Sequence, residues 1–138
     1  MPISSVYSKT LVIPKSAIDE NGHVNNVAYV QWMQDIAVEH YSSIGGVEAQ
    51  GYDATWVVRE HRIEYLLPAY AGEEIEVKTW VENIRRVRSL RKYEFVRKSD
   101  GKLLVKGETD WVFVDANSGR PLPIPEKVSS VFSLYTEK

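Results

Sequence analysis

The sequence contains no cysteine, and this limits the chemistry that the chain can perform. Without thiols there is neither a disulfide framework nor a thiolate nucleophile, and thiolate zinc sites are excluded as well. No apolar run approaches the ~20 residues needed to cross a bilayer, and the first residues lack the basic and apolar regions of an export signal. We therefore expect a cytoplasmic protein with no membrane partner.

The chain also has little excess charge and no compositional boundary. Its 17 Lys and Arg oppose 19 Asp and Glu, for a formal net charge of -2, so no global field attracts nucleic acid, and none is expected as a partner. There is no internal repeat, low-complexity tract or Pro/Ser-rich linker. A length of 138 residues suits one core, so residues 1–138 are expected to form a single domain.

The clearest secondary-structure pattern is a helix over residues 26–43. Its apolar positions recur at the 3.6-residue period, while Gln31, Gln34, Asp35 and Glu39 fall on the opposite side. The apolar face comprises Tyr29, Val30, Trp32, Met33, Ile36, Ala37 and His40. Asn25 or Asn26 is a suitable N-cap, and Gly45-Gly46 is a stop signal.

Five further segments resemble β-strands, at residues 5–13, 54–67, 74–83, 89–98 and 103–115. The turns between the last four are short, which favours antiparallel neighbours. In 74–83, apolar and charged residues alternate, as expected of a sheet with one covered and one wetter face. We predict a two-layer α+β domain in which one long helix covers an antiparallel sheet of about five strands.

Polar groups of three kinds gather in residues 18–29, where Asp19, Asn21 and His23 precede the start of the predicted helix. A helix N-terminus presents unpaired N–H groups and partial positive charge, which suit a developing oxyanion. A nearby carboxylate can attack a carbonyl carbon or deprotonate water. The same residues also suit purely structural roles, since Asp-Glu-Asn-Gly forms turns and Asn25-Asn26 forms caps.

This stretch, with its Asp-x-Asn-x-His-Val-Asn-Asn string, resembles the thioesterases of the 4-hydroxybenzoyl-CoA thioesterase and acyl-CoA thioester hydrolase group, and the plant acyl-ACP thioesterases in particular. The resemblance extends over nearly the whole chain, through Tyr93-Glu94-Phe95 and residues 100–103 to residues 111–125. It implies the hotdog fold, in which an antiparallel sheet wraps around one central helix. It also implies hydrolysis of an acyl thioester.

The resemblance assigns roles to four motif residues. Asp19 matches the catalytic carboxylate, Asn21 and His23 match the residues that accompany it in the plant enzymes, and Asn26 matches the position whose backbone N–H faces the thioester oxygen. On the first helical turn, Tyr29 is expected to contact substrate. The chain departs from the plant enzymes at residues 68–69, where Pro-Ala replaces their Glu-Cys pair and puts a cysteine-based mechanism out of reach.

Basic residues cluster around the turn before the fourth strand, and the resemblance places coenzyme A phosphates near Arg88 and Ser89. Guanidinium groups suit phosphate, although such clusters are equally typical of a solvated turn. The full set is Arg85, Arg86, Arg88, Ser89, Arg91 and Lys92.

Three other residues could carry protons. A second branch of hotdog thioesterases carries its carboxylate on the central helix, which makes Glu39 the alternative acid. We interpret His40 as a core residue with a single hydrogen-bond partner and assign no role to His61.

Hydrolysis of an acyl-CoA is the function we predict, with acyl-ACP hydrolysis as the alternative. Hotdog hydratases and dehydratases usually read Gly-Asp-x-Asn-Pro-x-His, whereas here Ile18 and Gly22 replace the glycine and proline, and one residue fewer precedes His23. A non-catalytic acyl-CoA sensor would need a further domain. A thioester is already activated, so no metal or redox cofactor is expected. An uncovered sheet edge predicts a homodimer or homotetramer with active sites at subunit boundaries.

Overall fold

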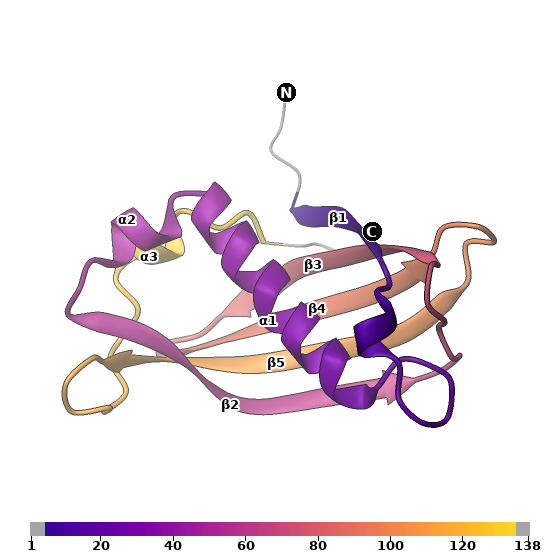
Figure 1. Cartoon of the computed structure of the whole chain (residues 1–138). Helices are drawn as coiled ribbons and strands as arrows, with labels where there is room; N and C mark the ends of the chain where they lie inside the picture. Colours follow the sequence, from indigo (N-terminus) through magenta and orange to yellow (C-terminus); the bar gives the residue numbers. More distant parts are fainter. Residues whose placement is uncertain (1–4, 135–138) are drawn as a thin grey trace.

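The computed structural model describes residues 5–134 and shows one antiparallel sheet with a long helix lying across it (Figure 1). The five strands follow the order β1-β3-β4-β5-β2. In chain order the elements are β1 (Val6–Val12), the 3-10 turn η1 (Lys15–Ala17), α1 (Asn26–Ser43), α2 (Gly46–Gln50), β2 (Ala54–Tyr65), β3 (Glu74–Ile84), β4 (Arg88–Arg97), β5 (Leu103–Asp115) and α3 (Glu126–Ser129). The predicted α+β architecture is confirmed.

Helix α1 has the bounds that the sequence predicts. The Asn25 side chain caps its first turn by accepting a 2.9 Å hydrogen bond from the N–H of Val27. The helix ends at Ser43, and Gly45 follows in the left-handed conformation with φ 84°, which glycine adopts at little cost. Its buried residues recur every three or four positions, so one stripe of the helix faces the sheet.

The sheet has one covered and one charged face, as the alternation in β3 predicts. Ile75, Val77 and Val81 are almost fully buried in the layer beneath α1. On the opposite face a broad polar groove carries both signs of charge, with Glu76, Lys78, Lys92, Glu94, Lys106 and Glu108 among the residues that line it. This face attracts water rather than a second hydrophobic layer.

The helix and the sheet approach each other closely where Gly107 of β5 faces Met33 of α1. A Cβ built at Gly107 would lie 2.9 Å from Met33 Sδ and 3.6 Å from the Tyr93 ring. Glycine therefore allows Met33, which is fully buried, to reach the sheet, and the helix rests on the core at its middle.

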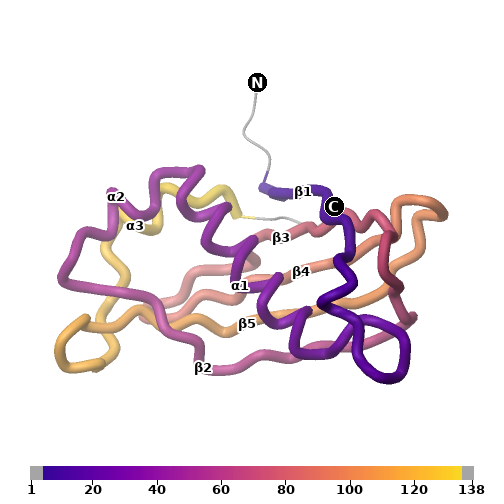
Figure 2. Tube along the Cα trace, viewed as in Figure 1, coloured from indigo at the N-terminus to yellow at the C-terminus, as the bar shows by residue number. Residues whose placement is uncertain are grey.

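The two ends of α1 lie in different surroundings (Figure 1). The loop that precedes the helix folds back beside its N-terminus, whereas α2, α3 and the start of β2 gather near its C-terminus. Figure 2 shows the C-terminal segment running beside α2 at that end. The sequence predicts neither α2 nor α3, because helices of five and four residues are too short for a recognisable period. Within residues 5–134, no helix is long and apolar enough to span a membrane.

Candidate active site

The predicted motif forms a tight turn directly before α1. The N–H of Asp19 donates to the His23 carbonyl and the N–H of Gly22 donates to the Asp19 carbonyl, each at 3.0 Å. Ile18 and Val24 close the turn with an antiparallel bridge. Gly22 has φ 83°, a left-handed conformation that residues with a Cβ rarely adopt, so glycine completes the turn.

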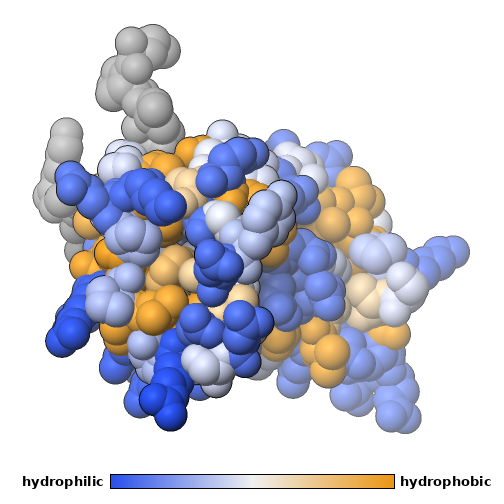
Figure 3. Space-filling model, turned by 90° about the vertical axis from the view of Figure 1, so that its left-hand side faces the viewer, coloured by the Kyte–Doolittle hydropathy of each residue, from blue (hydrophilic) through white to orange (hydrophobic). Residues whose placement is uncertain are grey.

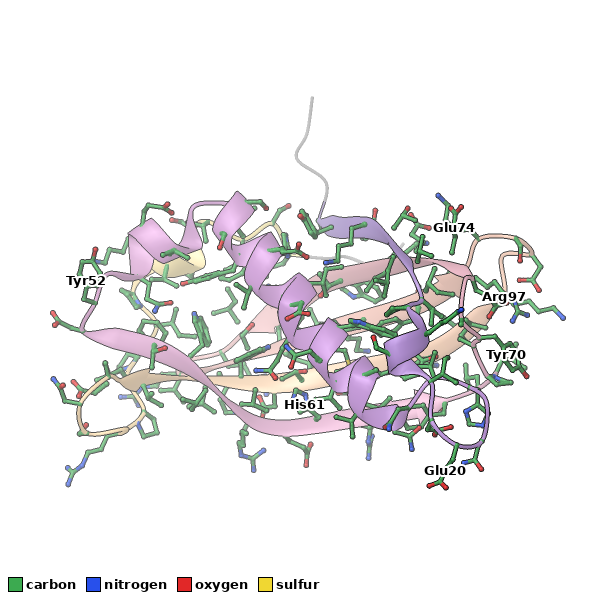
Figure 4. The ribbon with its side chains drawn as sticks, viewed as in Figure 1. Glu20, Tyr52, His61, Tyr70, Glu74 and Arg97 are labelled. Atoms are coloured by element: carbon green, nitrogen blue, oxygen red, sulfur yellow. The ribbon has the colours of Figure 1, made fainter. Side chains whose placement is uncertain are left out.

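No hydrogen bond joins the side chains of Asp19, Asn21 and His23 to one another. Asp19 Oδ1 accepts a 2.9 Å hydrogen bond from the backbone N–H of Asn21, while Oδ2 has no hydrogen-bond partner among residues 5–134. Asp19 and His23 are half-buried and Asn21 is exposed. At the tip of the turn, Glu20 points away from the protein (Figure 4). The turn therefore holds the Asp19 carboxylate in place through backbone contacts and leaves one of its oxygens available.

Two backbone hydrogen bonds join this turn to the body of the protein. The N–H of Val24 donates to the Ala69 carbonyl at 2.9 Å, and the N–H of Asn25 donates to the Ala17 carbonyl at 2.8 Å. Asn25 then caps α1 through Val27. In the described part of the chain the N–H of Asn26 donates to no acceptor, so it remains available at the positive end of an 18-residue helix.

Exposed apolar side chains lie near the start of α1. Val27 is 73% exposed, and Tyr65, at the end of β2, is 46% exposed and donates a long 3.5 Å hydrogen bond to the Asn26 carbonyl. The segment that follows β2 adds Leu66, Leu67 and Tyr70 as exposed apolar or aromatic residues. An apolar ligand or a protein partner could cover this surface.

Tyr29 lies beneath the site and belongs to the core. Its ring is 4% exposed and packs edge-on against Trp32, Tyr65 and Phe95. Burial raises the pKa of its phenol to about 12. Tyr29 is therefore a neutral core residue that packs beneath the start of α1. A contact between Tyr29 and substrate, as predicted, would require the substrate to reach into the core.

Arg88 and Ser89 lie near the opposite end of α1. Arg88 Nη2 and Nε contact the two Asp110 carboxylate oxygens at 3.0 and 3.3 Å, and Arg59 contacts the same carboxylate at 3.0 Å. Ser89 is buried and donates to the Asn83 carbonyl at 3.0 Å. The structure thus separates these two residues from the Asp19 turn of the same chain.

One member of the predicted basic cluster lies in the interior. Arg91 is 4% exposed, and its Nη1 contacts His40 Nδ1 at 2.8 Å and Thr79 Oγ1 at 3.1 Å. The prediction of a basic cluster on the surface at residues 85–92 is wrong for Arg91. Side chains alternate along β4, so Ser89 and Arg91 face α1 while their neighbours face outward. That period of two was the signal in the sequence that could have placed Arg91 inside.

His40 is a buried residue with one hydrogen-bond partner, as predicted. Arginine can only donate, so Nδ1 of His40 accepts and the imidazole is neutral with its proton on Nε2. The ring also stacks on Tyr7 at a centroid distance of 5.2 Å. Burial first, and the neighbouring Arg91 second, lower the pKa of His40 from 6.5 to about 4.

The other candidate proton carriers have structural partners. Glu39 is exposed and forms an ion pair with Lys9 of β1 at 2.6 Å. His61 Nδ1 lies 2.8 Å from Thr109 Oγ1 across β2 and β5. Among residues 5–134, no three His, Cys, Asp or Glu side chains gather in a way that could hold a metal ion.

Comparison with protein families gives a match over most of the chain. A family model described as the thioesterase-like superfamily matches residues 13–132. The matched range includes the Asp19 turn, α1 and all strands except the first. A search of curated protein sequences gives no significant match.

Solved structures share the fold at low sequence identity. A 1,4-dihydroxy-2-naphthoyl-CoA thioesterase from Synechocystis is 17% identical, with 91% of this chain and 94% of that chain covered and a TM-score of 0.80. A Staphylococcus aureus protein solved in complex with CoA is 19% identical, with 100% of this chain and 92% of that chain covered and a TM-score of 0.85. A 12:0-ACP thioesterase from Umbellularia californica is 19% identical, with 93% of this chain and 51% of that chain covered and a TM-score of 0.83. These likenesses confirm the predicted hotdog fold.

The buried neutral His40 predicts a loss of stability in mild acid. Between pH 6.5 and about 4 the unfolded chain binds a proton on His40 that the folded chain excludes, so this contribution to folding is complete above pH 6.5 and declines as the pH falls. Between pH 7 and pH 4.5, we expect the free energy of unfolding to fall by about 2 kcal/mol more in the wild type than in His40→Gln. Urea denaturation of both proteins measures the difference.

The Gln variant is the matched control because its side-chain oxygen can still accept from Arg91 but does not titrate. His61, whose pKa is also lowered by burial, is present in both proteins and cancels in the comparison. Equal losses of unfolding free energy in the two proteins would show that the pKa of His40 is the same in the folded and the unfolded chain.

Proposed function

This chain belongs to the thioesterase-like superfamily, and we propose that the acyl thioester it hydrolyses is an acyl-CoA. The observation that carries the assignment of the site is the free N–H of Asn26, which begins α1 directly after the turn that holds the Asp19 carboxylate. A hydrogen-bond donor for an oxyanion and a base or nucleophile are thereby presented by one short segment.

In the proposed mechanism the thioester carbonyl oxygen accepts from the Asn26 N–H. The Asp19 carboxylate removes a proton from a water that adds to the carbonyl carbon, or adds to that carbon itself. The tetrahedral oxyanion is stabilised by the helix N-terminus, the C–S bond breaks, and the thiolate leaves and takes up a proton. Direct attack by Asp19 gives an anhydride, which a second step with water converts to the free acid. Asn21 and His23 orient the carboxylate or the water.

Coenzyme A is favoured as the carrier because Arg88 can reach an exposed phosphate. Its side chain is 47% exposed despite the contacts with Asp110, and Arg59, which shares Asp110, is 56% exposed. Two guanidinium groups beside one carboxylate retain a net positive charge for phosphate. An acidic carrier protein would need a broader basic surface, which a chain of net charge -2 does not promise.

A second subunit would bring these separated parts together. α1 is about 27 Å long, and Arg88 lies near the end opposite Asp19. In the described sheet β2 has β5 as its single neighbour, so its other edge is unpaired. Two-fold pairing of two β2 edges is antiparallel and would place the Tyr65 end of one subunit against the Ala54 end of the other. The Asp19 turn would then lie beside the partner's β4 start.

Asp19→Asn should lower kcat for acyl-CoA hydrolysis by roughly 100- to 10 000-fold, because it removes the reacting carboxylate and preserves its volume. Steady-state kinetics with a chromogenic thiol reagent measure the effect, and urea denaturation checks that stability is retained. His23→Ala and Asn21→Ala should each cost roughly 10- to 1000-fold, as expected of orienting groups. A larger loss from His23→Ala than from Asp19→Asn would reverse the assigned roles.

Arg88→Ala should raise KM for acyl-CoA by roughly tenfold with a smaller change in kcat, because a charged contact with phosphate is lost. The penalty should vanish for an acyl-pantetheine substrate, which has no nucleotide. Kinetics with matched acyl-CoA, acyl-pantetheine and acyl-ACP test the carrier directly. An unchanged KM together with faster hydrolysis of acyl-ACP would establish the carrier protein instead.

Light scattering at micromolar concentration should give at least twice the 15.8 kDa mass of one chain. Shared sites make a sharper test possible, because a mixed dimer of Asp19→Asn and Arg88→Ala subunits would contain one site with both residues intact. Co-refolding the two variants should therefore restore about a quarter of the wild-type kcat/KM. A mixture no more active than the average of its components would place each site within one chain.

A further inference from the structure

A cavity of about 240 Å³ lies at the other end of α1, between the helix, the sheet and the C-terminal segment. Val38 and Tyr41 of α1, Trp56 of β2, Trp111 of β5 and Phe132 are among its lining residues, and Arg91 of β4 joins them. Figure 3 shows this end of the molecule, where hydrophobic residues lie among hydrophilic ones. None of the motif residues 19–26 lines this cavity, whereas Ser89, one of the two residues predicted to contact coenzyme A, does.

The guanidinium of Arg91 has an incomplete set of partners. Its Nη1 contacts His40 and Thr79, which can occupy both of its N–H groups. Nε and Nη2 have no hydrogen-bond acceptor, and no carboxylate lies within 4.0 Å of the guanidinium, among the residues that the structure describes. The edge formed by Nε and Nη2 is one of the two guanidinium edges that can bind a carboxylate in a bidentate manner, and it is the one left without partners.

Both partners of Arg91 are uncharged, so its positive charge is not neutralised. His40 accepts as a neutral imidazole, and Thr79 donates to the Lys92 carbonyl while accepting from Arg91. Burial lowers the pKa of Arg91 to about 10, which still leaves the group protonated at neutral pH. A buried cation without an anion is unfavourable, and an incoming anion would relieve this cost.

Four aromatic residues form much of the remaining wall, and Gln50, Thr55 and Ser89 add polar groups to it. Tyr41 stacks on Phe132 with a centroid distance of 5.7 Å, and Trp56 packs edge-on against Tyr41 and Phe113. The indole Nε1 atoms of Trp56 and Trp111 are buried and lack a hydrogen-bond partner within residues 5–134. Because these two nitrogen atoms are closed off from the cavity, they offer no hydrogen bond to a ligand, and the aromatic rings instead suit a flat apolar body.

We propose that this cavity binds a small carboxylic acid, with its carboxylate on the Nε and Nη2 edge of Arg91 and its apolar body against Trp56, Tyr41 and Phe132. A cavity of about 240 Å³ has room for a ligand of roughly the size of benzoate or hexanoate. A thioester carries no negative charge at its carbonyl, whereas the free acid does. The site therefore distinguishes the chemical class of a hydrolysis product from that of its substrate.

Isothermal titration calorimetry with benzoate and its neutral analogue benzamide tests the proposal on the full-length protein. Benzoate should bind saturably and roughly 10- to 100-fold more tightly than benzamide, because only the anion pairs with Arg91. In ¹⁵N spectra the indole signals of Trp56 and Trp111 should shift with benzoate, while those of Trp32 and Trp80 should not. Equal affinities, or shifts at Trp32 or Trp80 instead, would overturn the assignment.

Two variants locate the site independently. Arg91→Met should remove the preference for benzoate over benzamide, whereas Arg97→Met, at the far end of the same strand and bound to Glu73 and Asp100, should preserve it. Val38→Trp fills the cavity from an exposed position of α1, so folding is retained and binding of both ligands should fall at least tenfold. Wild-type benzoate affinity in Val38→Trp or Arg91→Met would place the ligand elsewhere.

Asp19→Asn separates this proposal from the proposed catalytic site. Benzoate affinity should be unchanged in that variant even though hydrolysis is lost, because the cavity lies about 20 Å along α1 from the Asp19 turn of the same chain. A joint loss of benzoate binding and hydrolysis in Asp19→Asn would mean that the carboxylate binds at the motif and not at Arg91.

Discussion

The packing of α1 across one face of the sheet is the contact on which the rest of the structure depends. Met33 can reach the sheet because residue 107 has no side chain, and the buried stripe on either side of Met33 holds the helix along its length. The N-terminus of the helix is thereby fixed beside the Asp19 turn, and its C-terminal half forms a wall of the Arg91 cavity. Both polar sites are consequences of one hydrophobic contact.

Most of this fold could be predicted from the sequence because its signals are periodic. Residues 26–43 repeat every 3.6 positions, and Ile75, Val77 and Val81 alternate with charged neighbours, so the helix and the covered face of the sheet could both be predicted. The segments 46–50 and 126–129 contain barely one turn each and have no period to detect. Their helical state depends on contacts with distant segments, which sequence patterns do not reveal.

The two sites differ in how far the sequence could predict them. Asp19, Asn21, His23 and Asn26 lie within eight positions, so a contiguous motif identifies them and the structure places them in one turn and the helix start that follows. The Arg91 group is assembled from three elements separated by 12 and 51 positions in the chain. In the sequence Arg91 stands among other basic residues, and the three-dimensional fold is needed to reveal its burial.

The tight contact at Gly107 makes α1 a spacer of fixed length. Each residue added to or removed from a helix rotates everything beyond it by about 100° and shifts it by about 1.5 Å. An insertion between Asn26 and Met33 would turn the Asp19 loop away from the sheet, and one between Met33 and Tyr41 would turn the cavity wall outward. A change of chain length within residues 26–43 therefore disturbs one of the two sites, because the contact at Met33 fixes the rotation of the helix on the sheet.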